Sequence, residues 1–241
     1  MLELFPEGFE EIERDDGVEL VGYTDAGGEE RMWFTFGNAS ARDVASGWEH
    51  RWRDFHKPVV VEGLWIGPPW EEAPPDRPRI VIDPGRAFGT GAHETTRLTL
   101  RLLSTLRRGS LLDVGCGSGV LSIAAARLGF GPITAIDIDE QAVEATRRNA
   151  KANAVAVTAV VADALRDELP AADVGVANVT SEMVEAAACR LDVMQLATSG
   201  YLVSDPPRPL SGFVHVRRIS ENGWAADAYA RRSETHVRTA Q

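Results

Sequence analysis

The pattern of apolar and polar residues divides the first 80 residues into two zones, 1–45 and 46–80. In residues 1–45, the short apolar runs "GVELVGY" and "RMWFTF" are separated by "DAGGEE", which predicts the two strands of a hairpin. Residues 46–80 are rich in tryptophan and proline, and Trp48, Trp52 and Phe55 recur at helical spacing. We therefore expect a short helix there, followed by an extended, proline-broken connector.

From Ile80 onward, strand-like and helix-like segments alternate, which predicts a parallel sheet covered by helices. Strands are expected at 111–114, 133–138, 156–163, 173–178 and 200–205, and helices over 95–106, 120–128, 140–153 and 181–196. Only "SENG" separates two further strands, 212–219 and 224–232. Because this connection is too short for a crossover helix, the last pair must be antiparallel.

These patterns predict an α/β fold in three parts. An amino-terminal β-rich appendage is expected over 1–45 and a linker over 46–80, followed by the main domain over 81–241. In that domain we expect a doubly wound, seven-stranded, mostly parallel sheet. The composition, with 44% hydrophobic and 25% charged residues, is typical of a globular protein.

The formal net charge of −11 limits the classes of partner. It argues against direct nucleic-acid binding through a broad surface, because the phosphate backbone dominates such binding. It is compatible with a basic protein or a cationic small molecule, and equally with a surface charge that serves only solubility.

The two cysteines, Cys116 and Cys189, have no CxxC spacing and no neighbouring histidine cluster. We therefore expect neither a disulfide framework nor a metal site, and a reducing compartment fits. No apolar run is long enough to cross a bilayer, so the expectation is a cytoplasmic protein without membrane contact.

A glycine turn is the strongest candidate for chemistry. It follows a buried strand and precedes a helix, and it contains Gly115, Gly117 and Gly119. Such glycines let a ligand approach the backbone. Asp137 ends the next strand 22 residues after Gly115, where its carboxylate can accept from both hydroxyls of a ribose. The alternative is a turn that only packs a helix on a strand.

Two details favour S-adenosylmethionine over a dinucleotide at this turn. Val120 stands where the dinucleotide pattern requires a small residue. Asp113 lies two residues before the first glycine, and an acid there suits the cationic methionine end better than a pyrophosphate. The DxGxGxG order resembles the first motif of class I methyltransferases, which implies a Rossmann-like fold.

Acidic and amide residues at the ends of the other strands extend the expected site. Asp163 is expected to meet the adenine amino group or to cap a helix, or both, with Ile138 and Ala164 beside the same cofactor. Asn178 follows the fourth strand, where its amide can accept from an amine and donate to another group. The alternative for Asn178 is also a helix cap.

Several segments together resemble the ribosomal protein L11 methyltransferases, from about Trp48 to Asn178. They are "WEHRWRDFHKPVVVEGLWIGPPWEE", "IDPGRAFGTGAHETTRLTL", "LLDVGCGSGVLSIAAARLG", "AIDIDEQAVEATRRNAKAN" and "ADVGVANV". The resemblance implies that Thr96, Gly115, Asp137 and Asn178 contact the cofactor. It places Phe88, Gly89, Thr90 and His93 in a loop that closes over it, with Phe88 as an apolar lid. The hydroxyls of Thr95 and Thr96 are then expected to face the methionine carboxylate.

The chain also departs from the family pattern in three places. About 45 residues precede the linker, too few for the family's ferredoxin-like amino-terminal domain, which docks the ribosomal protein. The family's "ANIL" is "ANVT" here, and the expected fifth strand continues as "YLVSDPPRPL" in place of an "LSGIL"-like turn.

The expected function is S-adenosylmethionine-dependent N-methylation of a protein, and the resemblance implies a ribosomal protein as that substrate. Alignment of the amine with the methyl group is the main catalytic task. Asn178 is expected to orient the amine, and His93 is a candidate for taking its proton, with a structural role in the loop as the alternative. Another protein lysine, a small-molecule amine or a non-catalytic cofactor-binding module remain open. A dehydrogenase is disfavoured because no Tyr-x-x-x-Lys is visible.

Overall fold

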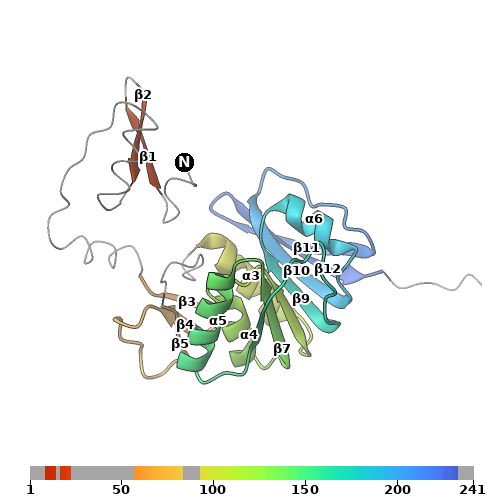
Figure 1. The fold of residues 1–241 in the computed structure, drawn as a ribbon, viewed down its shortest axis with the longest axis horizontal. Coiled ribbons are helices and arrows are strands. Elements are labelled where there is room, and N and C mark those ends of the chain that lie inside the picture. The colour runs from red at the N-terminus through yellow and green to blue at the C-terminus, as the bar shows by residue number, and fades with distance from the viewer. Residues whose placement is uncertain (1–8, 15–16, 23–56, 84–92, 233–241) are drawn as a thin grey trace, which may run out of the picture. The chain divides into compact units, whose positions relative to one another are not determined.

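The computed structural model describes residues 9–14, 17–22, 57–83 and 93–232. The chain forms two compact units, Met1–Trp52 and Arg53–Gln241. In the first unit, β1 (Phe9–Arg14) pairs antiparallel with β2 (Gly17–Gly22) (Figure 1).

The amino-terminal hairpin is thus present, and "GVELVG" is one of its strands. The expected partner "RMWFTF" lies outside the described residues, so its pairing stays a prediction. The partner among the described residues is "FEEIER". The four charged residues among these six hide the strand from a hydrophobicity pattern, although a two-residue connection makes the pairing local.

The second unit is built on a seven-stranded sheet with the order β11-β12-β10-β9-β6-β7-β8. Its strands are β6 (Leu111–Val114), β7 (Ile133–Asp137), β8 (Thr158–Val161), β9 (Ala172–Asn178), β10 (Val193–Leu202), β11 (Phe213–Glu221) and β12 (Trp224–Arg231). Five neighbouring strands, β10 to β8 in that order, are parallel, and β12 is antiparallel to both of its neighbours. The predicted mostly parallel sheet and its antiparallel last pair are confirmed.

Helices cover both faces of this sheet, as expected for a doubly wound fold. They are α3 (Glu94–Thr105), α4 (Val120–Arg127), α5 (Glu140–Ala152) and α6 (Ser181–Ala188). One apolar core joins α3 and α4 to the face that carries Val174 and Val176. A second core joins α6 to the opposite face, which carries Ala177 and Leu196. Among the described residues, no helix combines the length and apolar character needed to cross a membrane.

A second, small sheet occupies part of the predicted linker. β3 (Val59–Val61) and β4 (Leu64–Gly67) form a hairpin, and β5 (Arg79–Val81) pairs parallel to β4. Glu62 and Gly63 between β3 and β4 both have positive φ, as a two-residue hairpin turn of type I′ requires.

The small sheet packs on the main core, because Leu64, Ile66 and Ile80 are buried in the same cluster as α3. The stretch expected to be an extended connector therefore contains three short strands. The sequence pattern does not reveal them, because prolines flank strands of only three or four residues. The predicted helix around Trp48 lies outside the described residues.

The boundary between α6 and β10 differs from the prediction. The expected helix 181–196 ends at Ala188, and the expected strand 200–205 begins already at Val193. Both faces of this strand are covered, because Ala197 lies in the core with α3 and Leu196 lies in the core with α6. Its sequence therefore lacks the alternation of a half-buried strand. Its last residues, "SGYL", have the same small-Gly-large-Leu order as the end of the family's "LSGIL" segment, so this expected departure from the family pattern is wrong.

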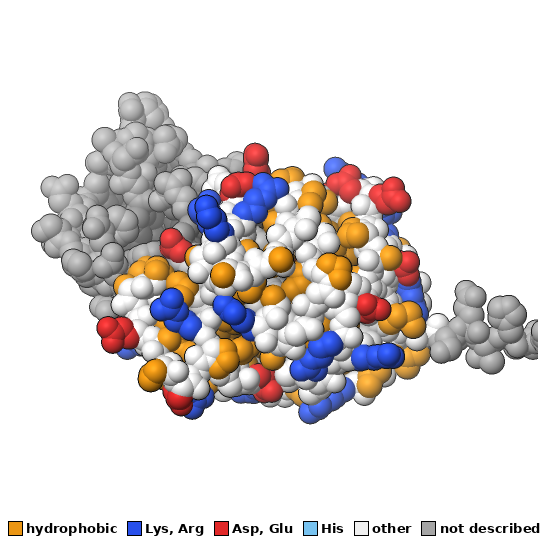
Figure 2. Space-filling view, turned by 90° about the horizontal axis from the view of Figure 1, so that it is seen from below, with side chains coloured by type: hydrophobic (Ala, Val, Ile, Leu, Met, Phe, Trp, Pro, Cys, Tyr) orange, Lys and Arg blue, Asp and Glu red, His pale blue; other side chains and the backbone are white. Residues whose placement is uncertain are grey.

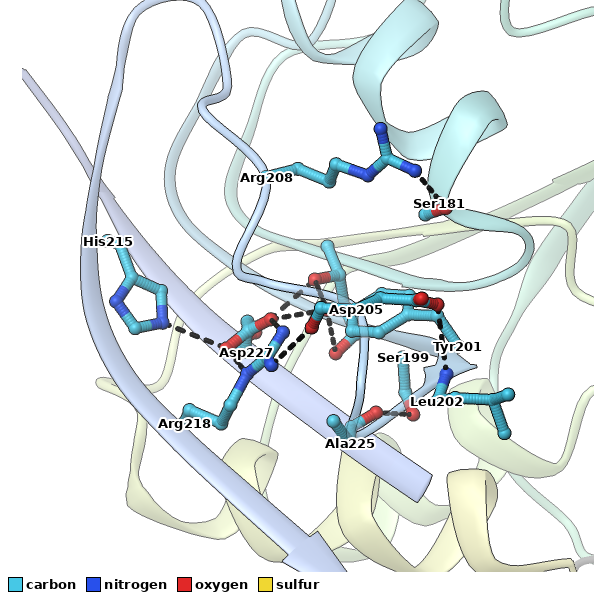
Figure 3. A network of polar contacts seen from close by, with 11 residues as sticks. Ser181, Ser199, Tyr201, Leu202, Asp205, Arg208, His215, Arg218, Ala225 and Asp227 are labelled. Carbon is cyan, nitrogen blue, oxygen red and sulfur yellow. Dashed lines mark hydrogen bonds and ion pairs between the residues drawn. The ribbon is translucent and has the colours of Figure 1, made fainter. Parts of the chain in front are cut away.

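A buried carboxylate joins the three carboxyl-terminal strands (Figure 3). Asp227 on β12 is completely buried and accepts from Arg218 Nε at 2.9 Å and Nη2 at 2.7 Å. His215 Nε2 lies 2.8 Å from the same carboxylate, and the Tyr201 hydroxyl donates to it at 2.9 Å. Burial by itself would raise the pKa of Asp227, but these hydrogen bonds outweigh it and lower the pKa.

We expect Asp227→Asn to reduce the free energy of unfolding by about 3 kcal/mol, because it leaves the Arg218 guanidinium without its counterion. Urea unfolding would measure this loss. Asp192→Asn is the matched control, since Asp192 is exposed and lies 3.4 Å from Arg231. This control should change stability little. Equal effects of the two substitutions would contradict the importance of the Asp227 network.

Candidate functional site

The carboxyl ends of β6, β7 and β9 surround a cavity of about 310 Å³. This volume is at the lower end of the range for small-molecule sites. Eight of the predicted residues line it: Thr96, Gly115, Gly117, Asp137, Ile138, Asp163, Ala164 and Asn178. His93, Thr95, Asp113 and Gly119 do not line it. Phe88, Gly89 and Thr90 lie outside the described residues.

The glycine turn has the left-handed backbone that its sequence predicts. Gly115, Gly117 and Gly119 have φ values of 73°, 53° and 80°. A Cβ atom at Gly115 would lie 2.6 Å from Val179 Cγ1, and one at Gly119 would lie 2.9 Å from Thr146 on α5. The third glycine is therefore required by the packing of α5, not by the wall of the cavity.

Asp137 is held firmly at the end of β7. Its Oδ2 accepts from the Gly117 N–H and its Oδ1 accepts from the Asp139 N–H, both at 3.0 Å. Because each carboxylate oxygen has a second lone pair, the side chain retains acceptor capacity toward the cavity. This arrangement suits a ligand with two neighbouring hydroxyls.

Asp163 combines a structural contact with a place in the cavity wall. Its Oδ1 accepts from the Leu165 N–H at 2.8 Å, so the side chain caps a turn, whereas the sequence suggested a helix cap. Ile138 also lines the cavity and is 69% exposed. An acceptor and an apolar side chain in the same cavity wall suit a flat, partly polar ring.

Asn178 does not cap the helix that follows it. Thr180 is the N-cap of α6 and its hydroxyl accepts from the Met183 N–H at 3.4 Å. The threonine that departs from the "ANIL" pattern thus has a capping role. Asn178 Nδ2 instead donates to Thr96 Oγ1 at 3.4 Å, which joins β9 to α3 and leaves the amide oxygen as an acceptor.

His93 and Thr95 have structural contacts at the start of α3. His93 is the N-cap, and its Nδ1 accepts from the Thr95 N–H at 3.3 Å and lies 2.8 Å from Thr95 Oγ1. The imidazole packs edge-on against Trp224, with ring centroids 4.8 Å apart. The Thr95 hydroxyl is therefore directed to His93. Roles of these two residues toward a cofactor or a proton stay predictions.

Asp113 lies beneath the glycine turn and is completely buried. Its Oδ2 accepts from Ser122 Oγ at 2.6 Å, whereas Oδ1 has no hydrogen-bond partner within the described part of the chain. Burial raises the pKa of this carboxyl to about 6. The hydrogen bond from Ser122 lowers the pKa, and the nearby charge of Asp137 raises it further.

The cavity wall also includes residues without a sequence signal. Cys116, Val179 and Met183 line it. Burial raises the pKa of the Cys116 thiol to about 12, so it stays protonated near neutral pH and is a packing residue, not a nucleophile. These apolar or weakly polar side chains carry no motif, and only the fold brings them to the cavity.

Comparison with known proteins identifies the family. The family model described as "Ribosomal protein L11 methyltransferase (PrmA)" matches residues 28–205. This chain belongs to the ribosomal protein L11 methyltransferase family. The match includes every described residue of the cavity wall and confirms the family resemblance of the sequence.

Individual relatives agree with this family membership. A ribosomal protein L11 methyltransferase of Dechloromonas aromatica is 51% identical over 125 residues, 51% of this chain and 42% of the relative. One of Burkholderia thailandensis is 40% identical over 73% of this chain and 62% of the relative. The chain thus spans about half the length of the curated L11 methyltransferases that it matches.

The fold is also that of a solved family member. The crystal structure of a ribosomal protein L11 methylase from Lactobacillus delbrueckii subsp. bulgaricus superposes with a TM-score of 0.64 at 27% identity. The match covers 74% of this chain and 100% of that chain. The Rossmann-like methyltransferase architecture expected from the sequence is confirmed.

The raised pKa of Asp113 gives this family member a predicted pH dependence of stability. The protonated carboxyl stabilises the fold fully below about pH 3.8, and this contribution is lost as the pH rises to about 6. Asp113→Asn cannot ionise. Its free energy of unfolding, relative to the wild type, should therefore increase by about 2 kcal/mol between pH 4.5 and 7.5.

Urea unfolding across this pH range would measure the difference. Asp173→Asn is the control, because hydrogen bonds from Ser110 lower the pKa of this exposed carboxyl. A lowered pKa affects stability only near and below the ordinary value of 3.8, so this variant should run parallel to the wild type between pH 4.5 and 7.5. Parallel curves for the wild type and Asp113→Asn would show that Asp113 is ionised in the folded protein.

Proposed function

We propose that this chain is an S-adenosylmethionine-dependent N-methyltransferase whose acceptor is an amino group of ribosomal protein L11. The observation that carries the proposal is the placement of Asp137, the glycine turn and Asn178 around one cavity in a chain of this family. The proposed acceptor follows the names of the relatives.

The residues of the cavity fit this cofactor. The left-handed backbone at Gly115 and Gly117 offers a wall without side chains, against which a ligand can lie. Asp137 would accept from the ribose hydroxyls, and Ile138 and Asp163 would contact the adenine. Thr96 and Asn178 would lie toward the methionine end. The bound cofactor supplies a methyl group on a positively charged sulfur.

The chain's own residues have the task of presenting the acceptor. An attacking amine must be neutral, whereas a free lysine has a pKa of about 10.4. A buried position beside a cation would lower that pKa. With Asn178 Nδ2 directed to Thr96, its amide oxygen is the acceptor that would orient an amine N–H. His93 lies outside the cavity wall with Nδ1 in the cap of α3, which favours loss of the proton to water.

A basic protein is a compatible partner for a chain with a net charge of −11. Figure 2 shows one face of the molecule, on which Lys and Arg side chains lie among apolar, acidic and other side chains. The negative net charge favours a protein or small amine as substrate over a nucleic acid, because the phosphate backbone dominates nucleic-acid binding.

Cofactor binding is testable by isothermal titration with S-adenosylmethionine. We expect Asp137→Ala to weaken binding at least about tenfold, because it removes charged acceptors of two hydroxyls. Asp139→Ala is the matched control. The Asp139 carboxylate caps α5 by accepting from the Gln141 N–H at 2.8 Å and does not line the cavity. Full affinity of Asp137→Ala would remove the basis for the proposed ribose contact.

Methyl transfer itself is testable with labelled cofactor and purified L11. We expect label in L11 with the wild-type chain and a strongly reduced kcat with Asn178→Ala. A panel of other proteins and small amines distinguishes the remaining acceptors. Cofactor binding without transfer to any of them would favour a non-catalytic binding module, and label in small amines alone would contradict the L11 acceptor.

A further inference from the structure

Two carbonyl groups of the glycine turn are held by side chains of the neighbouring helix α5. Thr146 Oγ1 donates to the Gly117 carbonyl oxygen at 3.0 Å. One turn further along α5, Asn149 Nδ2 donates to the Ser118 carbonyl oxygen at 2.9 Å. Both side chains are buried, with 0% and 3% exposure, so water does not compete for these bonds.

These bonds fix the orientation of the peptide groups in the turn. In a planar trans peptide, the N–H points opposite to the carbonyl of the preceding residue. With the Gly117 carbonyl directed to α5, the N–H of Ser118 points away from that helix. Ser118 and Gly117 both line the cavity, so the orientation of their peptide groups decides which atoms a ligand meets.

An external restraint is needed here because the turn has little stiffness of its own. Glycines at 115, 117 and 119 leave the backbone free to adopt more conformations than any other residue would allow. Gly119 also lies so close to Thr146 that a Cβ would meet its Cγ2 and Oγ1 at 2.9 Å. The contact with α5 thus restrains both the position and the orientation of the turn.

Contacts with Asp83, beyond the end of β5, also fix the Asn149 amide. Its Oδ1 accepts from the Asp83 N–H at 3.1 Å, and its Nδ2 also donates to the Asp83 carbonyl oxygen at 3.4 Å. The amide therefore cannot be reversed without losing bonds on both sides, and its nitrogen is directed to the Ser118 carbonyl. The Asn149 side chain thus bonds both to Asp83, directly after the small sheet, and to Ser118 in the glycine turn.

We propose that Thr146 and Asn149 are positioning residues for cofactor binding. They hold the Gly117 and Ser118 peptide groups in the orientation that receives S-adenosylmethionine. This inference rests on the proposed function, because the ligand is the proposed cofactor. Preorganisation of a glycine-rich turn raises affinity by removing the cost of ordering it during binding.

The test compares matched substitutions by isothermal titration with S-adenosylhomocysteine and by thermal unfolding without ligand. Thr146→Val removes the donor at nearly constant volume, and Thr146→Ser keeps it. Asn149→Asp keeps the acceptor for Asp83 and replaces the donor that faces Ser118. We expect Thr146→Val and Asn149→Asp each to weaken binding at least about tenfold and Thr146→Ser to bind within about threefold of the wild type.

Two control substitutions separate positioning from general stability. Thr99 is also completely buried, but its hydroxyl donates to the Thr95 carbonyl within α3 at 2.7 Å. Asn153 lies one turn beyond Asn149, and its amide bonds to the Val81 backbone at 2.8 and 2.6 Å, not to the glycine turn. We expect Thr99→Val and Asn153→Asp to lower the unfolding temperature while binding within about threefold of the wild type.

The outcomes distinguish the inference from the function on which it rests. Wild-type affinity in both Thr146→Val and Asn149→Asp would overturn the inference alone, as would equal losses in the two control variants. If the wild-type chain itself binds neither S-adenosylmethionine nor S-adenosylhomocysteine, the proposed function fails and the inference fails with it. Should Thr146→Val not fold, Asn149→Asp against Asn153→Asp decides the matter.

Discussion

The left-handed backbone between β6 and α4 is the constraint on which the candidate site depends. It turns the chain sharply at the carboxyl end of β6, and it does so without side chains on Gly115 and Gly119. The absence of these side chains lets Val179, directly after β9, and Thr146 of α5 approach the turn. A side chain larger than hydrogen would separate the turn from Val179 in the cavity wall at Gly115, and from α5 at Gly119.

The sheet order brings the chemically active residues to this turn. β6 lies between β7 and β9, and Val114 is paired with Ile136 on one side and Ala177 on the other. The next residues along those strands are Asp137 and Asn178. A carboxylate and an amide therefore flank Gly115 at the same edge, where ligands bind in open α/β sheets.

The hairpin of β11 and β12 supports α3, the helix that carries Thr96 in the cavity wall. Glu221, which ends β11, accepts from Arg97 Nη2 at 3.1 Å and from Arg101 Nη1 at 2.6 Å. The indole of Trp224, which begins β12, packs against His93 at the start of α3. The hairpin thereby braces the helix that carries Thr96, and the buried Asp227 network holds the three strands of this region together.

The sequence alone determined the parallel core of the sheet, most helix positions and the main polar and glycine residues of the cavity wall, namely Gly115, Gly117, Asp137, Asp163 and Asn178. These follow from local signals: short apolar runs, a glycine turn, and acidic or amide residues at strand ends. The sequence misplaced β10 because a strand covered on both faces lacks alternation, and it missed β3 to β5 because prolines flank very short strands.

Only the tertiary structure decided how the site residues divide their work. Gly119 and His93 stand inside the family signature, yet their contacts are with Thr146 and with the cap of α3. Asn178 is of a residue type that often caps helices, but Thr180 occupies the N-cap position of α6. A sequence motif records which residue types occur together. The partner of each side chain depends on elements distant in the chain, and only packing brings those elements into contact.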